Sequence, residues 1–162
     1  MVGSAVVRLL RSRGYPAILA PLRAELDLLD GPGVENYFRA HRPEYVFMIA
    51  ARVGGIAANS SDPAGFLSDN ARMTLNLFQA CQRFPPRKNL FLGSSCIYPR
   101  MCPRPIKEEY LLTGPFEPTN EGYAIAKLMG LRYAAFLHRQ YGMPTVCPVP
   151  CNLYGTNDHF DF

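Results

Sequence analysis

The alternation of helix and strand patterns along the 162 residues constrains the fold of this chain more than any other feature. Apolar residues recur every three to four positions in some segments, which indicates helices with one buried face. We expect helices at Val2–Leu10, Val34–His41, Pro63–Arg83 and Asn120–Tyr141. Short apolar runs between these segments predict buried strands. We expect strands at Pro16–Ala20, Tyr45–Ala50, Asn89–Gly93 and Pro144–Val149.

Strands that alternate with helices predict a parallel sheet covered by helices, which is the α/β class. The length is sufficient for one domain with its own core, so residues 1–162 are interpreted as a single partial dinucleotide-binding domain. The proline-rich segment 99–118 cannot be regular throughout and is expected to lie on the surface. Pro148 lacks an N–H group and must lie where the sheet needs no donor.

Composition excludes several classes of function. Apolar residues make up 48% and charged residues 19%, as in ordinary globular proteins. There is no apolar run long enough to span a membrane and no signal-peptide pattern at the N-terminus, so we expect a cytoplasmic protein without a membrane partner. The net charge of +4 is scattered rather than arranged as a basic stripe interleaved with aromatics, so we expect no nucleic-acid partner.

The five cysteines predict neither disulfides nor a metal site. Cys147 and Cys151 are separated by three residues, not by the two of a typical zinc pair, and the chain has no second pair. We therefore expect no metal and interpret these two thiols as small buried apolar side chains at and just beyond a strand end.

Two short motifs carry candidate chemistry. Ser94 follows a predicted strand, and ligands of open parallel sheets bind beyond the carboxyl ends of strands. Tyr123 and Lys127 are four residues apart and share a helix face, where an ammonium beside the phenol lowers the phenol pKa. Taken separately, the serine is typical of a turn and the tyrosine–lysine pair of an exposed helix surface.

Together, Ser94, Tyr123 and Lys127 resemble the Ser-Tyr-Lys triad of extended short-chain dehydrogenases and nucleotide-sugar epimerases. Within that superfamily the chain is most similar to the GDP-L-fucose synthase family, from Met1 to about Phe160. The blocks that carry this resemblance are Ala50-Ala-Arg-Val-Gly-Gly-Ile56, Gly93-Ser-Ser-Cys-Ile-Tyr-Pro99, Glu117-Pro-Thr-Asn-Glu121 and Asn152-Leu-Tyr-Gly155.

The resemblance implies a Rossmann-type parallel sheet with helices on both faces, lacking the first strand and the C-terminal substrate domain. It implies an epimerase/reductase that converts GDP-4-keto-6-deoxy-mannose to GDP-L-fucose with NADPH. Tyr123 would protonate the C4 oxygen, Lys127 would hold the nicotinamide ribose and depress the Tyr123 pKa, and Ser94 would bind the substrate carbonyl. Cys96 matches the epimerisation base, and its alternative interpretation is a small buried hydrophobe.

The resemblance also assigns cofactor positions. Gly3 matches the last glycine of the Gly-x-x-Gly-x-x-Gly loop, and Arg23 matches a 2′-phosphate contact, which favours NADP over NAD. Without the resemblance, Arg23 would be an ordinary exposed loop cation. The remaining positions that match the cofactor site are Asp27, Leu28, Leu92, Gly93, Lys127 and Asn152.

Two alternatives remain at this point. The chain could be another NAD(P)-dependent nucleotide-sugar epimerase or dehydratase, or a non-catalytic protein derived from the same fold. His159 does not align with the family's catalytic histidine, so that role is not assigned to it. Because the first strand is central in the family's sheet, we expect the chain alone to be inactive and poorly folded. A homodimer through the long helices is a further expectation from the resemblance.

Overall fold

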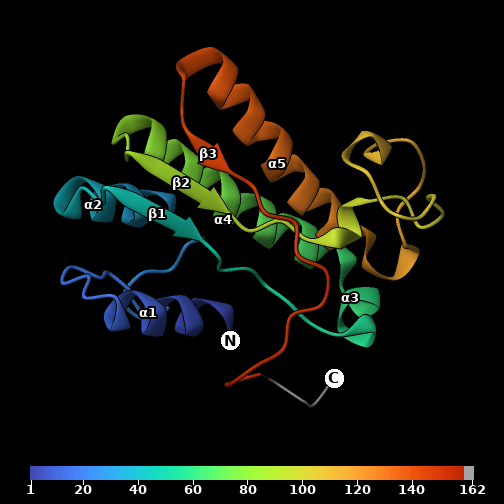
Figure 1. Ribbon diagram of the computed structural model, residues 1–162, viewed down its shortest axis with the longest axis horizontal. Coiled ribbons are helices and arrows are strands. Elements are labelled where there is room, and N and C mark those ends of the chain that lie inside the picture. The colour runs from blue at the N-terminus through green and yellow to red at the C-terminus, as the bar shows by residue number, and fades with distance from the viewer. Residues whose placement is uncertain (159–162) are drawn as a thin grey trace.

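The computed structural model describes residues 1–158 and forms a three-stranded parallel sheet with long helices packed beside it (Figure 1). The strands are β1 (Tyr45–Met48), β2 (Lys88–Phe91) and β3 (Thr145–Val146), in the order β1-β2-β3. The α-helices are α1 (Val2–Ser12), α2 (Gly31–His41), α3 (Ile56–Ser61), α4 (Pro63–Arg83) and α5 (Glu121–Tyr141). Short 3₁₀ helices are η1 (Ser95–Ile97), η2 (Glu108–Tyr110) and η3 (Pro118–Asn120). The expected parallel α/β architecture is confirmed.

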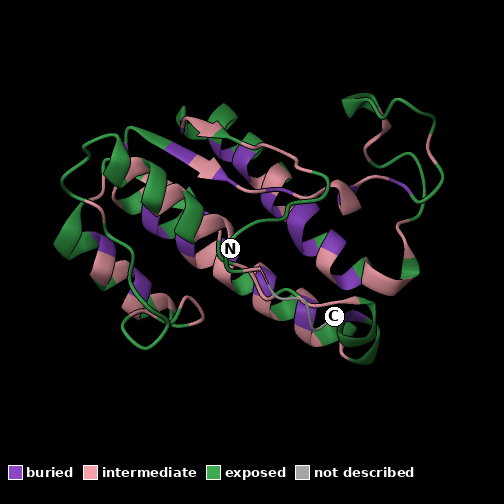
Figure 2. Cartoon of the chain, turned by 60° about the horizontal axis from the view of Figure 1, so that its bottom comes forward, coloured by how far each residue is buried: buried purple, intermediate pink, exposed green. Residues whose placement is uncertain are grey.

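The core lies between one face of this sheet and the helices α2, α4 and α5. Met48 and Phe91 stand opposite each other on β1 and β2 and are both buried on this face. The Phe91 ring packs on Phe78 of α4, with ring centroids 5.7 Å apart. It also lies against Gly130 of α5, where a side chain would overlap the ring. Figure 2 shows buried residues concentrated along the long helices and the strands.

The opposite face of the sheet is open in the part of the chain that the structure describes. Side chains on this face alternate with the core residues, and Tyr45, Phe47 and Val146 are each exposed. Helix α1 has no buried residue. Among residues 1–158, helices α2, α4 and α5 thus cover one face of the sheet. These three helices do not cover the second face, for which the resemblance also predicts helices.

Residues 16–20 do not form the expected strand. They have no regular secondary structure, and the sheet of the described residues contains β1, β2 and β3 alone. An apolar run becomes a strand only where a neighbouring chain completes its ladder of hydrogen bonds. No described strand pairs with this segment, so the prediction of a strand here was wrong.

The last strand is shorter than expected because of its prolines. Only Thr145 and Val146 pair in regular fashion, whereas the run was expected to reach Val149. The carbonyls of Pro148 and Pro150 still accept hydrogen bonds from the N–H groups of Gly93 (2.9 Å) and Ser95 (3.1 Å). Neither proline can donate, so only half of the ladder continues. The expectation that Pro148 lies where no donor is needed stays a prediction. Cys151, expected to be buried just beyond this strand, is exposed because the chain has left the sheet there.

The long helices agree closely with the sequence pattern. Helix α4 begins with Asp62 as its N-cap, whose carboxylate accepts the Gly65 N–H at 3.0 Å, and with Pro63 in its first turn. Helix α5 ends at Tyr141 and is capped by Gly142, whose φ of 69° is the left-handed conformation that glycine adopts readily. Helix α3 was not predicted, since six residues are too few for a clear helical period.

Candidate active site

Lys127 is buried at the junction of α5 with the end of β2. It is only 4% exposed, and its Nζ donates to the carbonyl oxygen of Leu92 at 2.8 Å. Leu92 follows β2, and its own N–H donates to the carbonyl of Met48 at 3.1 Å as the last link to β1. The lysine therefore caps the sheet where the β1–β2 ladder ends. Burial lowers the pKa of Lys127 to about 8, and the nearby Cys96 opposes this shift.

Cys96 and Ser94 are in direct contact just beyond the same strand end. The Cys96 thiol donates to Ser94 Oγ across 3.1 Å, within the short turn η1 that begins at Ser95. Burial raises the pKa of the Cys96 thiol, while the Ser94 hydrogen bond and the Lys127 ammonium act in the opposite direction. The thiol is thus held beside two groups that favour its ionised form.

Tyr123 lies one turn before Lys127 on α5, and the Lys127 Nζ is 5.7 Å from the centre of its ring. Burial raises the pKa of Tyr123 to about 12, and a thiolate at Cys96 adds to this shift. The expected depression of the Tyr123 pKa by Lys127 is not what the structure shows. The ammonium is hydrogen-bonded to Leu92 and faces the aromatic ring, and burial disfavours the phenolate.

Close helix packing brings these four side chains to one edge of the sheet. Gly122 lies against the Pro63 carbonyl, and Gly130 against Phe91, so α5 approaches both α4 and β2 closely. A hydroxyl, a thiol, a phenol and an ammonium consequently share one place at the carboxyl end of β2. Such a set can bind a carbonyl oxygen and exchange protons with it and with the carbon beside it.

The cofactor positions Gly93 and Asn152 lie on the segments that leave β2 and β3. Gly93 is buried, and a Cβ there would stand 3.1 Å from the Pro148 carbonyl, whereas Asn152 is exposed. The segment that leaves β3 continues to the start of α1, where Asn157 Nδ2 donates to Ser4 Oγ at 3.5 Å (Figure 1). Gly3 lies in that first helical turn, and a Cβ there would meet no atom within 4 Å. An open helix N-terminus therefore lies beside the exit from β3, which fits a phosphate group.

The remaining cofactor positions lie in the loop before α2. Arg23 is exposed. In residues 1–158 no hydrogen bond or ion pair joins it to the four side chains at the carboxyl end of β2. Asp27 accepts the Leu29 N–H at 3.0 Å. The Leu28 carbonyl accepts from Asn76 of α4 at 2.8 Å, so this loop is anchored to the core helix. The structure thus leaves the roles of these three residues as predictions.

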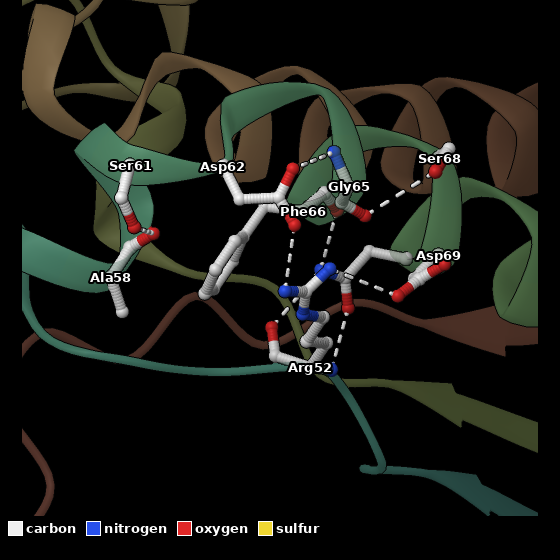
Figure 3. A network of polar contacts seen from close by, with 9 residues as sticks. Arg52, Ala58, Ser61, Asp62, Gly65, Phe66, Ser68 and Asp69 are labelled. Carbon is white, nitrogen blue, oxygen red and sulfur yellow. Dashed lines mark hydrogen bonds and ion pairs between the residues drawn. The ribbon is translucent and has the colours of Figure 1, made fainter.

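Arg52 lies in the block Ala50–Ile56, from which the sequence predicts no role for the arginine. Arg52 pairs with Asp62 and Asp69, and its guanidinium lies over the ring of Phe66 (Figure 3). The signal in the sequence that could have indicated a role for Arg52 is its charge, since the rest of this block consists of apolar residues and glycine. His159, whose role was left unassigned, lies outside the described residues.

The described residues contain neither a candidate metal site nor a candidate membrane span. No group of three or more histidine, cysteine or acidic side chains in residues 1–158 could hold a metal ion. Over the same range, none of the helices has both the length and the apolar character needed to cross a bilayer.

A parallel α/β sheet with serine, tyrosine and lysine at its carboxyl edge defines the short-chain dehydrogenase class of folds and sites. The NAD-dependent epimerase/dehydratase family model matches residues 1–162, and the chain belongs to that family.

Comparison with individual proteins points in the same direction. The chain is 47% identical over 161 residues to GDP-L-fucose synthase of Sinorhizobium fredii, covering 99% of this chain and 51% of that protein. It is 44% identical over 160 residues to putative GDP-L-fucose synthase 2 of Arabidopsis thaliana, covering 99% and 49%. A solved GDP-L-fucose synthetase from Naegleria fowleri, bound to NADP, superposes with a TM-score of 0.87 at 29% identity, covering 98% and 49%. The chain thus spans about half the length of the proteins it matches.

Proposed function

We propose that this protein acts as an NADPH-dependent epimerase/reductase that converts GDP-4-keto-6-deoxy-mannose to GDP-L-fucose. The observation that carries the proposal is the Cys96–Ser94 contact of 3.1 Å at the edge that also holds Tyr123 and Lys127. A reductase needs a proton donor for the new hydroxyl, whereas epimerisation beside a ketone needs a base as well. The four side chains supply both.

The chain fits the cofactor in three ways. The N-terminus of α1 is open around Gly3, Lys127 presents a buried cation at the carboxyl end of β2, and Gly93 lines the same edge. We propose that Leu92, Gly93, Lys127 and Asn152 hold the nicotinamide half, and that Gly3, Arg23, Asp27 and Leu28 hold the adenosine phosphate half. NADPH would supply the hydride that reduces the ketone, while protons come from the protein. The Naegleria relative binds NADP, which supports this choice.

In the epimerisation step, Cys96 removes a proton from a carbon beside the ketone. Ser94 donates a hydrogen bond to the ketone oxygen, which gains negative charge as the C–H bond breaks. Inversion then requires that the carbon receive a proton on its opposite face, from a donor other than Cys96, and the proton held by Cys96 exchanges with solvent. Because burial raises the Cys96 pKa, the charge of Lys127 is needed to stabilise the thiolate. The Ser94 hydroxyl accepts a hydrogen bond from the neutral thiol, so its own proton is available for the ketone oxygen.

In the reduction step, Tyr123 transfers its hydroxyl proton to the C4 oxygen. The raised pKa of Tyr123 keeps the phenol protonated before this step. Lys127 stays positively charged beside it and compensates the phenolate that forms. We further propose a cytoplasmic location and a homodimer formed through the long helices, where Phe136 and Tyr141 are exposed on α5.

The direct test incubates the purified full-length protein with NADPH and GDP-4-keto-6-deoxy-mannose in deuterated water. We expect oxidation of NADPH, formation of GDP-L-fucose and deuterium at both epimerised carbons. UDP-glucose serves as the comparison substrate. Turnover of UDP-glucose without turnover of the GDP-sugar would instead support the alternative of a different nucleotide-sugar epimerase.

A further inference from the structure

Arg52 is the centre of a polar network that lies apart from Ser94, Cys96, Tyr123 and Lys127 (Figure 3). Its Nη2 is 2.8 Å from Asp62 Oδ2, and its Nη1 is 3.1 Å from Asp69 Oδ2. The guanidinium carbon lies 4.6 Å from the centre of the Phe66 ring. A planar fork that binds two carboxylates and stacks on an aromatic ring is held in one orientation, which a lysine could not reproduce.

The backbone of Arg52 is held as firmly as its side chain. Its N–H donates to Asn70 Oδ1 at 2.8 Å, and its carbonyl accepts from Asn70 Nδ2 at 3.0 Å. Asn70 is buried and also donates to the Phe66 carbonyl at 2.8 Å. The segment between β1 and α3 is therefore attached to the first three turns of α4 through both its main chain and its charge.

Gly65 leaves the space in which this network forms. A Cβ at Gly65 would overlap the Asp62 carboxylate and the Arg52 guanidinium. The Gly65 N–H instead donates to Asp62 Oδ1 at 3.0 Å, so Asp62 is held by the helix start on one oxygen and by Arg52 on the other.

The network continues to the catalytic helix through a backbone contact. Asp62 is followed by Pro63, and the Pro63 carbonyl lies so close to Gly122 that a Cβ there would overlap it. Gly122 precedes Tyr123 and is buried. The start of α4, which Arg52 holds, is thus the surface against which the start of α5 rests.

We propose that Arg52 is a positioning residue that sets the place of Tyr123, acting through Asp62, Pro63 and the close contact with Gly122. This inference rests on the proposed function, because it concerns the proton donor of that reaction. Proton transfer in the reduction is sensitive to displacements of the order of 1 Å, so a loosened α5 start should slow catalysis more than it weakens binding.

The test compares Arg52→Gln, Arg52→Lys and Asp69→Asn with Arg83→Gln in the full-length protein. Arg83→Gln is the matched control, because Arg83 is on the same helix at its other end and pairs with Glu35. For Arg52→Gln we expect kcat for NADPH oxidation to fall about tenfold with KM for NADPH nearly unchanged. Arg52→Lys and Asp69→Asn each keep one ion pair and should give smaller losses in the same direction.

Amide hydrogen exchange, resolved by peptide mass spectrometry, reports on the same proposal without activity. Arg52→Gln should speed exchange in the α5 peptide 121–130 as well as in 50–70, whereas Arg83→Gln should leave 121–130 unchanged. Faster exchange confined to 50–70, or an equal effect of the control, would overturn the positioning role. If the wild-type protein fails to convert the GDP-sugar, the proposed function fails, and the exchange comparison still decides whether Arg52 positions α5.

Discussion

The ammonium of Lys127 donates to the carbonyl of Leu92 at 2.8 Å, joining α5 to the end of β2 inside the protein. Lysine is seldom buried without a charged partner, because desolvation disfavours its cation. Here the cation has a backbone carbonyl, and the rings of Phe91 and Tyr123 lie 5.0 and 5.7 Å away. The contact between Lys127 and Leu92 therefore fixes the position of α5 relative to β2 and places a positive charge in the site.

The first prediction concerns pH. Burial lowers the pKa of Lys127 to about 8, so its positive charge is present below that pH and is lost as pH rises through it. We expect kcat/KM for reduction to fall as pH rises above about 8, because this parameter reports groups of the free enzyme. In Lys127→Arg the guanidinium stays charged, so the residual activity should not fall between pH 8 and 9. An unchanged alkaline limb in that variant would assign the limb to another group.

The second prediction separates the two chemical steps. Cys96→Ser should lower deuterium incorporation at the epimerised carbons by roughly 10²–10⁴-fold, since a hydroxyl is a far weaker base than a thiolate. Tyr123→Phe should instead abolish NADPH oxidation and leave deuterium exchange measurable. NMR of the GDP-sugar recovered from deuterated water follows both steps. Exchange at the wild-type rate in Cys96→Ser would show that Cys96 is not the base.

The third prediction concerns cofactor choice. Arg23→Ala should raise the Kd for NADPH about tenfold, roughly 1.4 kcal/mol, while the Kd for NADH changes little, because only NADPH carries a 2′-phosphate. Arg13→Ala, at the end of α1, is the control for loss of one exposed positive charge. Titration followed by nicotinamide fluorescence measures both constants. Equal weakening of NADPH and NADH would remove Arg23 from the phosphate site.

The fourth prediction concerns stability. A methyl group at Gly130 would overlap the Phe91 ring, so Gly130→Ala should lower the free energy of unfolding by about 1–3 kcal/mol. This loss outweighs the gain of up to about 1 kcal/mol that alanine brings to a helix interior. Gly3→Ala is the control, since a Cβ there meets no atom within 4 Å and should be neutral or stabilising. Urea unfolding of both variants measures the difference, and a stabilised Gly130→Ala protein would contradict the close approach of α5 to β2.

Long helices were predicted well because their signals are local. The apolar period of α4 repeats every three to four residues, and Asp62 and Pro63 stand directly at its start. Gly142 likewise follows the last residue of α5. Strands were predicted less well, because a strand depends on a partner distant in the sequence. Residues 16–20 have the composition of a strand but no ladder, and Pro148 and Pro150 remove the donors from the end of β3.

The sequence by itself determined the parallel α/β class, because the periods of helices and strands are local properties, and the reactive groups were predicted from its resemblance to a known family. Only the tertiary structure decided how those groups titrate. Motif spacing suggested that Lys127 lowers the Tyr123 pKa, yet burial raises that pKa to about 12, and the Lys127 ammonium donates to the Leu92 carbonyl. The role of Arg52 likewise appears only when Asp62, Asp69 and Phe66 are brought around it. Desolvation and close backbone contacts arise between segments that are distant in sequence, so local sequence patterns do not predict them.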